Sequence, residues 1–103
     1  MKDNARYAQT EPGIGLAAAQ FLVDEEVTLV SADTWAIEVF PNPDPSLFAP
    51  VHQLLLPRNG VYILENVFTE DLARDTAYEF AFVFAPLRLK GATGSPGNPL
   101  AIR

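Results

Sequence analysis

The chain has 103 residues, enough for one small domain, and it contains no internal repeat. Hydrophobic residues make up 49% of it and charged residues 19%, which is typical of a globular chain and excludes a disordered one. The net charge is −6, with 7 basic and 13 acidic residues and no Lys/Arg cluster. This charge excludes the electrostatic signature of nucleic-acid binding and argues against adhesion to anionic lipid.

The chain has no cysteine, which excludes disulfides and cysteine-based zinc sites. No apolar run approaches membrane-spanning length, and the first residues lack the apolar segment of a secretory signal. We therefore expect a cytoplasmic protein. Seven Phe, three Tyr and one Trp in so short a chain suggest that some apolar surface is buried against another chain, as in a homo-oligomer.

The first third of the chain predicts a loose segment, a helix and a strand. Residues 1–12 are polar and without periodicity, so we expect a loose N-terminal segment that ends at Pro12-Gly13. Residues 16–24 have apolar side chains at helical spacing and three consecutive alanines, with Gly13 or Gly15 as the N-cap. Residues 27–32 form a β-branched run typical of a short buried strand.

Asp33 follows this predicted strand, at the end where sites gather in open α/β sheets. The general habit of Asp at the ends of elements favours a turn-capping role instead. Residues 40–50 hold four of the nine prolines, and this predicts a surface loop. Its aromatic side chains fit a lid or interface arm, or a loop that covers its own core.

Residues 50–66 contain the only histidine, His52, and a carboxylate thirteen positions later, Glu65. We expect a helical turn that carries His52, a reversal at Pro57-Arg58-Asn59-Gly60, and a buried strand over 61–64 that ends at Glu65. This unit would let the imidazole face the carboxylate. Taken alone, such a histidine is more often a hydrogen-bonded structural residue than a metal ligand.

The last third predicts one helical turn at 69–73, with Thr69 as its cap. Residues 78–85 have aromatic side chains at every second position, which predicts a strand with an aromatic core face rather than a ligand-stacking platform. This strand is expected to continue through 87–90. A Gly/Pro loop over 91–99 and a final edge strand over 100–102 complete the chain.

Several segments occur in an order that resembles the C-terminal half of the cyclase family, the metal-dependent hydrolases that include bacterial kynurenine formamidase and isatin hydrolase. They are Pro-Gly-Ile-Gly-Leu-Ala-Ala-Ala-Gln-Phe-Leu at 12–22, Ala-Asp-Thr at 32–34, Pro-Val-His-Gln-Leu-Leu-Leu at 50–56, Gly-Val-Tyr-Ile-Leu-Glu-Asn at 60–66, and Phe-Ala-Pro-Leu with Gly-Ala-Thr-Gly-Ser-Pro within 84–96. The resemblance runs from about Tyr7 to Arg103. It implies an α/β fold with a mixed sheet and few helices, a partial swivelling β/β/α domain.

The resemblance implies that His52 and Glu65 are metal ligands, for zinc or manganese, and that the family's reaction is metal-assisted hydrolysis of a small amide, formamide or cyclic amide. The family's other ligands, from a His-x-Gly-Thr-His-x-Asp motif and a further catalytic histidine, have no match in this sequence. Ala36 and Glu38 stand where the family usually has Ser and Asp. No catalytic role is carried over to Asp33.

The sequence therefore predicts one partial domain over 1–103 whose metal site lacks ligands, because zinc and manganese need about three or four. Three explanations remain open: a complementary N-terminal-half chain completes the site, the gene is truncated, or the half-domain is retained as a non-catalytic oligomeric binding or assembly protein. In the first case the chain is part of an amidohydrolase with a small-molecule substrate.

Overall fold

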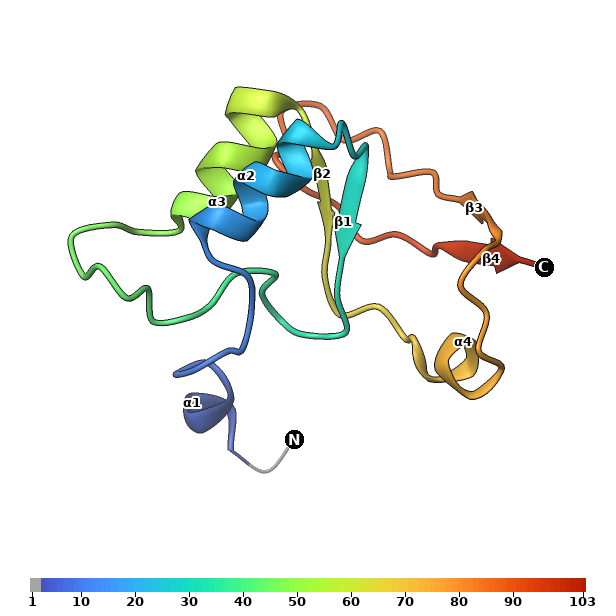
Figure 1. Cartoon of the computed structure of the whole chain (residues 1–103), viewed down its shortest axis with the longest axis horizontal. Helices are drawn as coiled ribbons and strands as arrows, with labels where there is room; N and C mark the ends of the chain where they lie inside the picture. Colours follow the sequence, from blue (N-terminus) through green and yellow to red (C-terminus); the bar gives the residue numbers. More distant parts are fainter. Residues whose placement is uncertain (1–2) are drawn as a thin grey trace. The chain divides into compact units, whose positions relative to one another are not determined.

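The computed structural model describes residues 3–103. The chain divides into two compact units, Met1–Phe68 and Thr69–Arg103, here called the N-terminal and the C-terminal unit. The class is α/β with few helices, as the sequence predicts, and each unit contains one two-stranded sheet (Figure 1). The parallel and antiparallel pairings therefore lie in separate sheets. That 1–103 form a single domain stays a prediction.

The N-terminal unit contains α1 (Asn4–Tyr7), α2 (Leu16–Asp24), β1 (Leu29–Ser31), α3 (Pro50–Gln53), the π-helical turn η1 (Leu54–Arg58) and β2 (Tyr62–Leu64). Strands β1 and β2 pair in parallel, with Val30 opposite Ile63. Helix α2 and the continuous α3–η1 helix contact each other, and η1 contacts β2 (Figure 1). The helices therefore cover the sheet and enclose a small core.

Helix α2 has the bounds that its periodicity predicts. Gly15 is the N-cap in extended conformation, and no side chain caps the helix there. At the other end, Glu26 is left-handed with φ 58°, and the N–H groups of Glu26 and Val27 bond the carbonyls of Val23 and Leu22. This Schellman arrangement ends the helix and turns the chain into β1.

Three expectations for this unit are corrected. The segment 1–12 is not loose over 3–12: α1 is capped by the Asp3 carboxylate, which accepts from Arg6 N–H at 3.0 Å, and Glu11 pairs with Phe40 in an isolated bridge. The strand predicted over 27–32 is shorter, Leu29–Ser31, because only these residues pair with β2. The Pro-rich loop extends to Ala49, while Pro50 is the first residue of α3, a position where its missing N–H is no loss.

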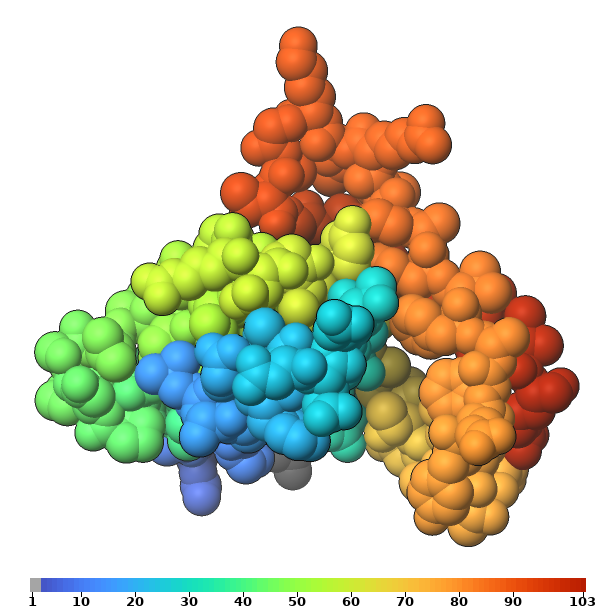
Figure 2. Space-filling view, turned by 45° about the horizontal axis from the view of Figure 1, so that its top comes forward, coloured from blue at the N-terminus to red at the C-terminus, as the bar shows by residue number. Residues whose placement is uncertain are grey.

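The Pro-rich loop lies at the surface of the N-terminal unit, where Figure 2 shows residues 41–49 in green. Phe48 is 82% exposed and does not cover the core, whereas Phe40, at the start of the predicted loop, is half-buried and packs edge-on against Trp35. Within the loop, Ser46 donates to Asp44 from both its backbone N–H and its hydroxyl. These two bonds lower the pKa of the Asp44 carboxyl, and they fix a local turn.

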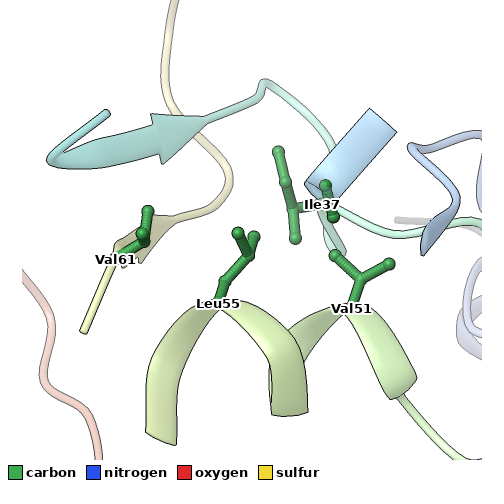
Figure 3. Close-up of a cluster of buried hydrophobic side chains, with 5 residues drawn as sticks. Ile37, Val51, Leu55 and Val61 are labelled. Carbon is green, nitrogen blue, oxygen red and sulfur yellow. The ribbon is translucent and has the colours of Figure 1, made fainter. Parts of the chain in front are cut away.

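The core of the N-terminal unit is formed by five buried side chains: Ala19, Ile37, Val51, Leu55 and Val61. Val51 and Leu55 are four residues apart on one face of α3–η1, and Figure 3 shows both projecting toward Ile37. Because α3 buries this face, His52 lies on an adjacent face of the helix. The packing of two aliphatic side chains thus sets the direction in which the histidine projects.

The C-terminal unit contains α4 (Glu70–Arg74), β3 (Ala81–Val83) and β4 (Leu100–Ile102). Thr69 is the N-cap of α4 without a side-chain bond, and Arg74 bonds Asp71 and Asp75. Strands β3 and β4 pair antiparallel, with Phe82 opposite Ala101. The loop between them forms a narrow protrusion in Figure 2.

The prediction of an aromatic core face over 78–85 is wrong. Tyr78 is 86% exposed, Phe82 is 43% exposed, and none of residues 69–103, all of which the structure describes, is buried. The strand is also limited to Ala81–Val83 and does not continue through 87–90, because β4 supplies only three pairing residues. Period two correctly indicated a strand here, but it did not indicate what covers the aromatic side chains.

Leu55 offers a direct test of the core. Leu55→Ala is expected to destabilise the protein by about 2–5 kcal/mol, because it opens a cavity at a fully buried position. The adjacent Leu56→Ala, at a side chain that is 40% exposed, is the matched control and should cost much less. Urea unfolding followed by circular dichroism measures both. Equal losses for the two variants would contradict this core.

Candidate metal-ligating site

The candidate site consists of one imidazole between two carboxylates. His52 Nδ1 lies 2.5 Å from Glu38 Oε1, and His52 Nε2 lies 3.2 Å from Glu65 Oε1. Three separate segments supply these groups: the residues before the Pro-rich loop, helix α3, and the residue that follows β2. The structure thus brings His52 and Glu65 together, as the spacing in the sequence predicts.

Glu38 is the most enclosed member of the site, with its side chain 3% exposed. Its Oε1 accepts the N–H of His52 and its Oε2 accepts the N–H of Val51, both at 3.2 Å. These are backbone donors at the start of α3, which have no partner inside the helix. The carboxylate of Glu38 therefore accepts hydrogen bonds from two backbone N–H groups at the start of α3 and also contacts the ring of His52.

Glu65 is held from the opposite side. Its Oε1 accepts the N–H of Ile37 at 2.8 Å, so the residue next to Glu38 fixes the second carboxylate. Asn66, which follows Glu65, has a left-handed backbone with φ 56°, donates its N–H to Thr34 and accepts a bond from the Tyr7 hydroxyl at 3.3 Å. The side chain of Glu65 is 27% exposed, so the site opens to the surface on this side.

The segment that carries Glu38 lies unusually close to Gly13. Ile14 donates its N–H to Ile37 and accepts from Val39, so the two segments run side by side around Glu38. A Cβ on Gly13 would lie 2.3 Å from the carbonyl carbon of Glu38, well inside contact distance. Glycine at position 13 therefore permits the approach that places Glu38 beneath α3.

His52 Nε2 and Glu65 Oε1 are atoms of the kinds that ligate a divalent cation. An ionised carboxylate only accepts hydrogen bonds, so a hydrogen bond from the ring to an ionised Glu38 uses an Nδ1–H. In a ring with that single proton, Nε2 has a free lone pair 3.2 Å from Glu65 Oε1, and these two atoms together can bind a proton or a metal ion. Two ligands of one metal, each about 2.1 Å from it, lie roughly 3.0–3.4 Å apart.

The site supplies only two such ligands. No cluster of three or more His, Cys, Asp or Glu side chains that could hold a metal occurs among residues 3–103. Asp33, two residues beyond β1, is exposed and takes part in none of the hydrogen bonds or ion pairs found in this part of the chain. A complete zinc or manganese site would therefore need groups from another polypeptide segment.

Glu38 is the site residue whose role was not predicted from the sequence. A signal was nonetheless present, since Glu38 is the single charged residue in the run Trp-Ala-Ile-Glu-Val-Phe at 35–40. A carboxylate within an apolar run is expected to be buried and therefore to need hydrogen-bond donors. The sequence did not show that His52, 14 positions away, is one of them.

Among known proteins, the chain has similarity to a solved structure but not to a family model or a curated protein. No protein-family model and no curated protein matches the chain. A crystal structure described as that of a novel cyclase is similar to it, with a TM-score of 0.76 and 37% sequence identity. The match covers 91% of this chain and 31% of that chain.

The chain is therefore similar to part of a solved cyclase along nearly all of its own length, and its fold resembles the matched part of that structure. This likeness supports the resemblance found in the sequence motifs. The chain spans less than a third of the length of the cyclase that it matches. In the part of the chain that the structure describes, no helix has the length and apolar character needed to cross a membrane.

Gly13→Ala tests whether the close approach of residue 13 builds the site. The added methyl group must displace the backbone around Glu38, so we expect a loss of about 1–3 kcal/mol in the free energy of unfolding. The control is Gly94→Ala, where a Cβ meets nothing within 4 Å. Urea denaturation compares the two variants, and a Gly13→Ala protein as stable as the control would show that the approach is not required.

Proposed function

We propose that the chain is part of a metal-dependent hydrolase of the cyclase type and that it supplies two of the metal ligands, His52 and Glu65. The observation that carries the proposal is the 3.2 Å approach of His52 Nε2 to Glu65 Oε1, two atoms of the kinds that ligate zinc and manganese. The likeness to a solved cyclase supports the same assignment. The reaction class is hydrolysis of the C–N bond of a small amide, formamide or cyclic amide.

A bound zinc or manganese ion would supply Lewis-acid polarisation of the carbonyl and a lowered pKa for the attacking water. In this chain, two residues would ligate the metal ion and a third group would orient one of them. Nε2 of His52 and Oε1 of Glu65 are the two donors, and the Ile37 N–H keeps the Glu65 carboxylate turned toward the ring. The surface position of Glu65 leaves this side of the site open to further ligands and to substrate.

The remaining ligands are proposed to come from another polypeptide, either a second copy of this chain or a complementary chain. The C-terminal unit supports an association of this kind. Leu100 and Ile102 of β4 are 51% and 55% exposed, and Val83 of β3 is 49% exposed. A two-stranded sheet with no buried residue is marginal in water unless another surface covers it.

A second candidate function is non-catalytic assembly on the same scaffold. It is favoured by the fact that Glu38, His52 and Glu65 are already partnered with one another inside the chain. In that case a proton occupies the place between Nε2 and Glu65, and the three groups act as a structural cross-link between α3 and the end of β2. Metal content separates the two candidates.

Metal content is the first test. The purified chain is expected to contain zinc or manganese in stoichiometric amount by elemental analysis. His52→Ala and Glu65→Gln are expected to lose it, because the first removes a ligating nitrogen and the second removes the negative charge of the ligating carboxylate. Asp33→Asn, at an exposed carboxylate near the same edge of the β1–β2 sheet, is the matched control and should retain the metal. Wild-type protein without metal above background would leave only the assembly function.

Mass in solution is the second test. We expect light scattering after size exclusion to show a dimer or a larger oligomer, because the apolar side chains of the C-terminal unit need cover. Phe82→Ser and Ile102→Ser, on opposite faces of the β3–β4 sheet, show which face is covered, and Ser95→Ala in the adjoining loop is the control. A monomer at micromolar concentration would exclude the second copy as the source of ligands.

Hydrolysis itself is measured with aryl formamides and cyclic amides on the metal-loaded oligomer. Turnover that disappears in His52→Ala supports the hydrolase. Stoichiometric metal without turnover on any of these compounds would restrict the proposal to metal binding.

A further inference from the structure

We propose that Glu38 is a positioning residue for His52: its buried carboxylate fixes both the orientation and the tautomer of the imidazole, so that an unprotonated Nε2 is presented to Glu65. The inference concerns a residue for which the family resemblance supplied no role. The inference extends the proposed function. Only its consequence for metal affinity rests on that function. The tautomer itself is a property of the chain without metal.

The geometry around Glu38 leaves the ring of His52 little freedom. Oε1 of Glu38 is shared by the backbone N–H of His52, at 3.2 Å, and the ring Nδ1 of the same residue, at 2.5 Å. The backbone bond fixes the base of the side chain and the ring bond fixes its end. A flip of the ring by 180° would break the second bond and leave a buried carboxylate oxygen without it.

The carboxylate itself cannot easily move. Its backbone lies between the two hydrogen bonds that Ile14 makes with Ile37 and Val39, and Gly13 packs directly on its carbonyl carbon. Its second oxygen is held by the N–H of Val51. Val51 is fully buried in the core, so the helix that donates these bonds is fixed as well.

A carboxylate is needed at this position, and an amide cannot replace it. Glu38 accepts hydrogen bonds from the backbone N–H groups of Val51 and His52, and its Oε1 also contacts the ring Nδ1 of His52. Glutamine has a single acceptor oxygen and would direct its NH2 group at one of these donors. A histidine that ligates a metal through one nitrogen usually donates from the other to such a group.

The test uses the fact that the chain has one histidine, so a two-bond ¹H–¹⁵N correlation spectrum of the ring shows His52 alone. Metal-free protein at alkaline pH, where an imidazole carries one proton, is expected to show Nδ1 protonated and Nε2 unprotonated. Glu38→Leu is expected to abolish this preference, and Glu38→Asp to retain it in part, because it keeps a carboxylate on a shorter side chain.

Glu11→Leu is the matched control, because Glu11 is the other buried carboxylate of the N-terminal unit and contacts neither nitrogen of His52. It should leave the ring spectrum unchanged. Wild-type protein in the Nε2–H tautomer would overturn the proposal without any variant. The same conclusion would follow if a folded Glu38→Leu protein kept the wild-type ring spectrum.

Metal affinity gives the second readout, by competition of Zn²⁺ between the protein and a chromophoric chelator. Glu38→Gln is expected to weaken binding by about 10–100-fold relative to wild type and to Glu11→Gln. Unchanged affinity in Glu38→Gln would overturn the positioning role for metal binding. Absence of Zn²⁺ binding by the wild type would instead refute the proposed function, while the tautomer spectrum still decides the role of Glu38.

Discussion

The carboxylate of Glu38 is the interaction on which the N-terminal unit depends. It satisfies the first backbone donors of α3, contacts the ring of His52, and is carried by a segment that Ile14 and Gly13 hold in place. A charged group that is 3% exposed is stable only with such a set of donors. The same contacts that make this burial possible also determine where the histidine points.

This arrangement gives the site a rigid half and an open half. On the rigid side, His52 and Glu65 are fixed by Glu38 and by the Ile37 N–H, and all these groups belong to the N-terminal unit. On the open side, residues 3–103 contain no group of three or more His, Cys, Asp or Glu side chains that could hold a metal ion. The chain covers 31% of the length of the cyclase that it resembles.

The two units differ in how far they bury their apolar side chains. The N-terminal unit buries aliphatic side chains from α2, α3 and β2 around Leu55. The C-terminal unit also contains large apolar residues, yet those on both faces of the β3–β4 sheet remain exposed. Its secondary structure is therefore formed without a core of its own, which is typical of a segment that packs against a further surface.

The sequence by itself determined the elements whose signals are local. Periodicity and capping gave the bounds of α2, proline density gave the loop before α3, and the spacing of His52 and Glu65 around Asn59-Gly60 predicted that the two would meet. Local signals also indicated β3 and β4, but period two describes only the alternation of faces. It carries no information on whether a face is covered, so the aromatic residues were wrongly placed in a core.

The role of Glu38 was decided only by the tertiary structure. Because Glu38 stands in an apolar run, its carboxylate was expected to need hydrogen-bond donors. These donors lie on α3, which follows a long irregular loop, and no local sequence pattern predicts that α3 approaches Glu38. The approach depends on Gly13 as well, through a contact between segments 25 residues apart in the chain (38 − 13). The donors that satisfy a buried charge are brought together by the tertiary structure, and for that reason the sequence alone pointed to His52 and Glu65 but not to Glu38, which contacts the ring of His52.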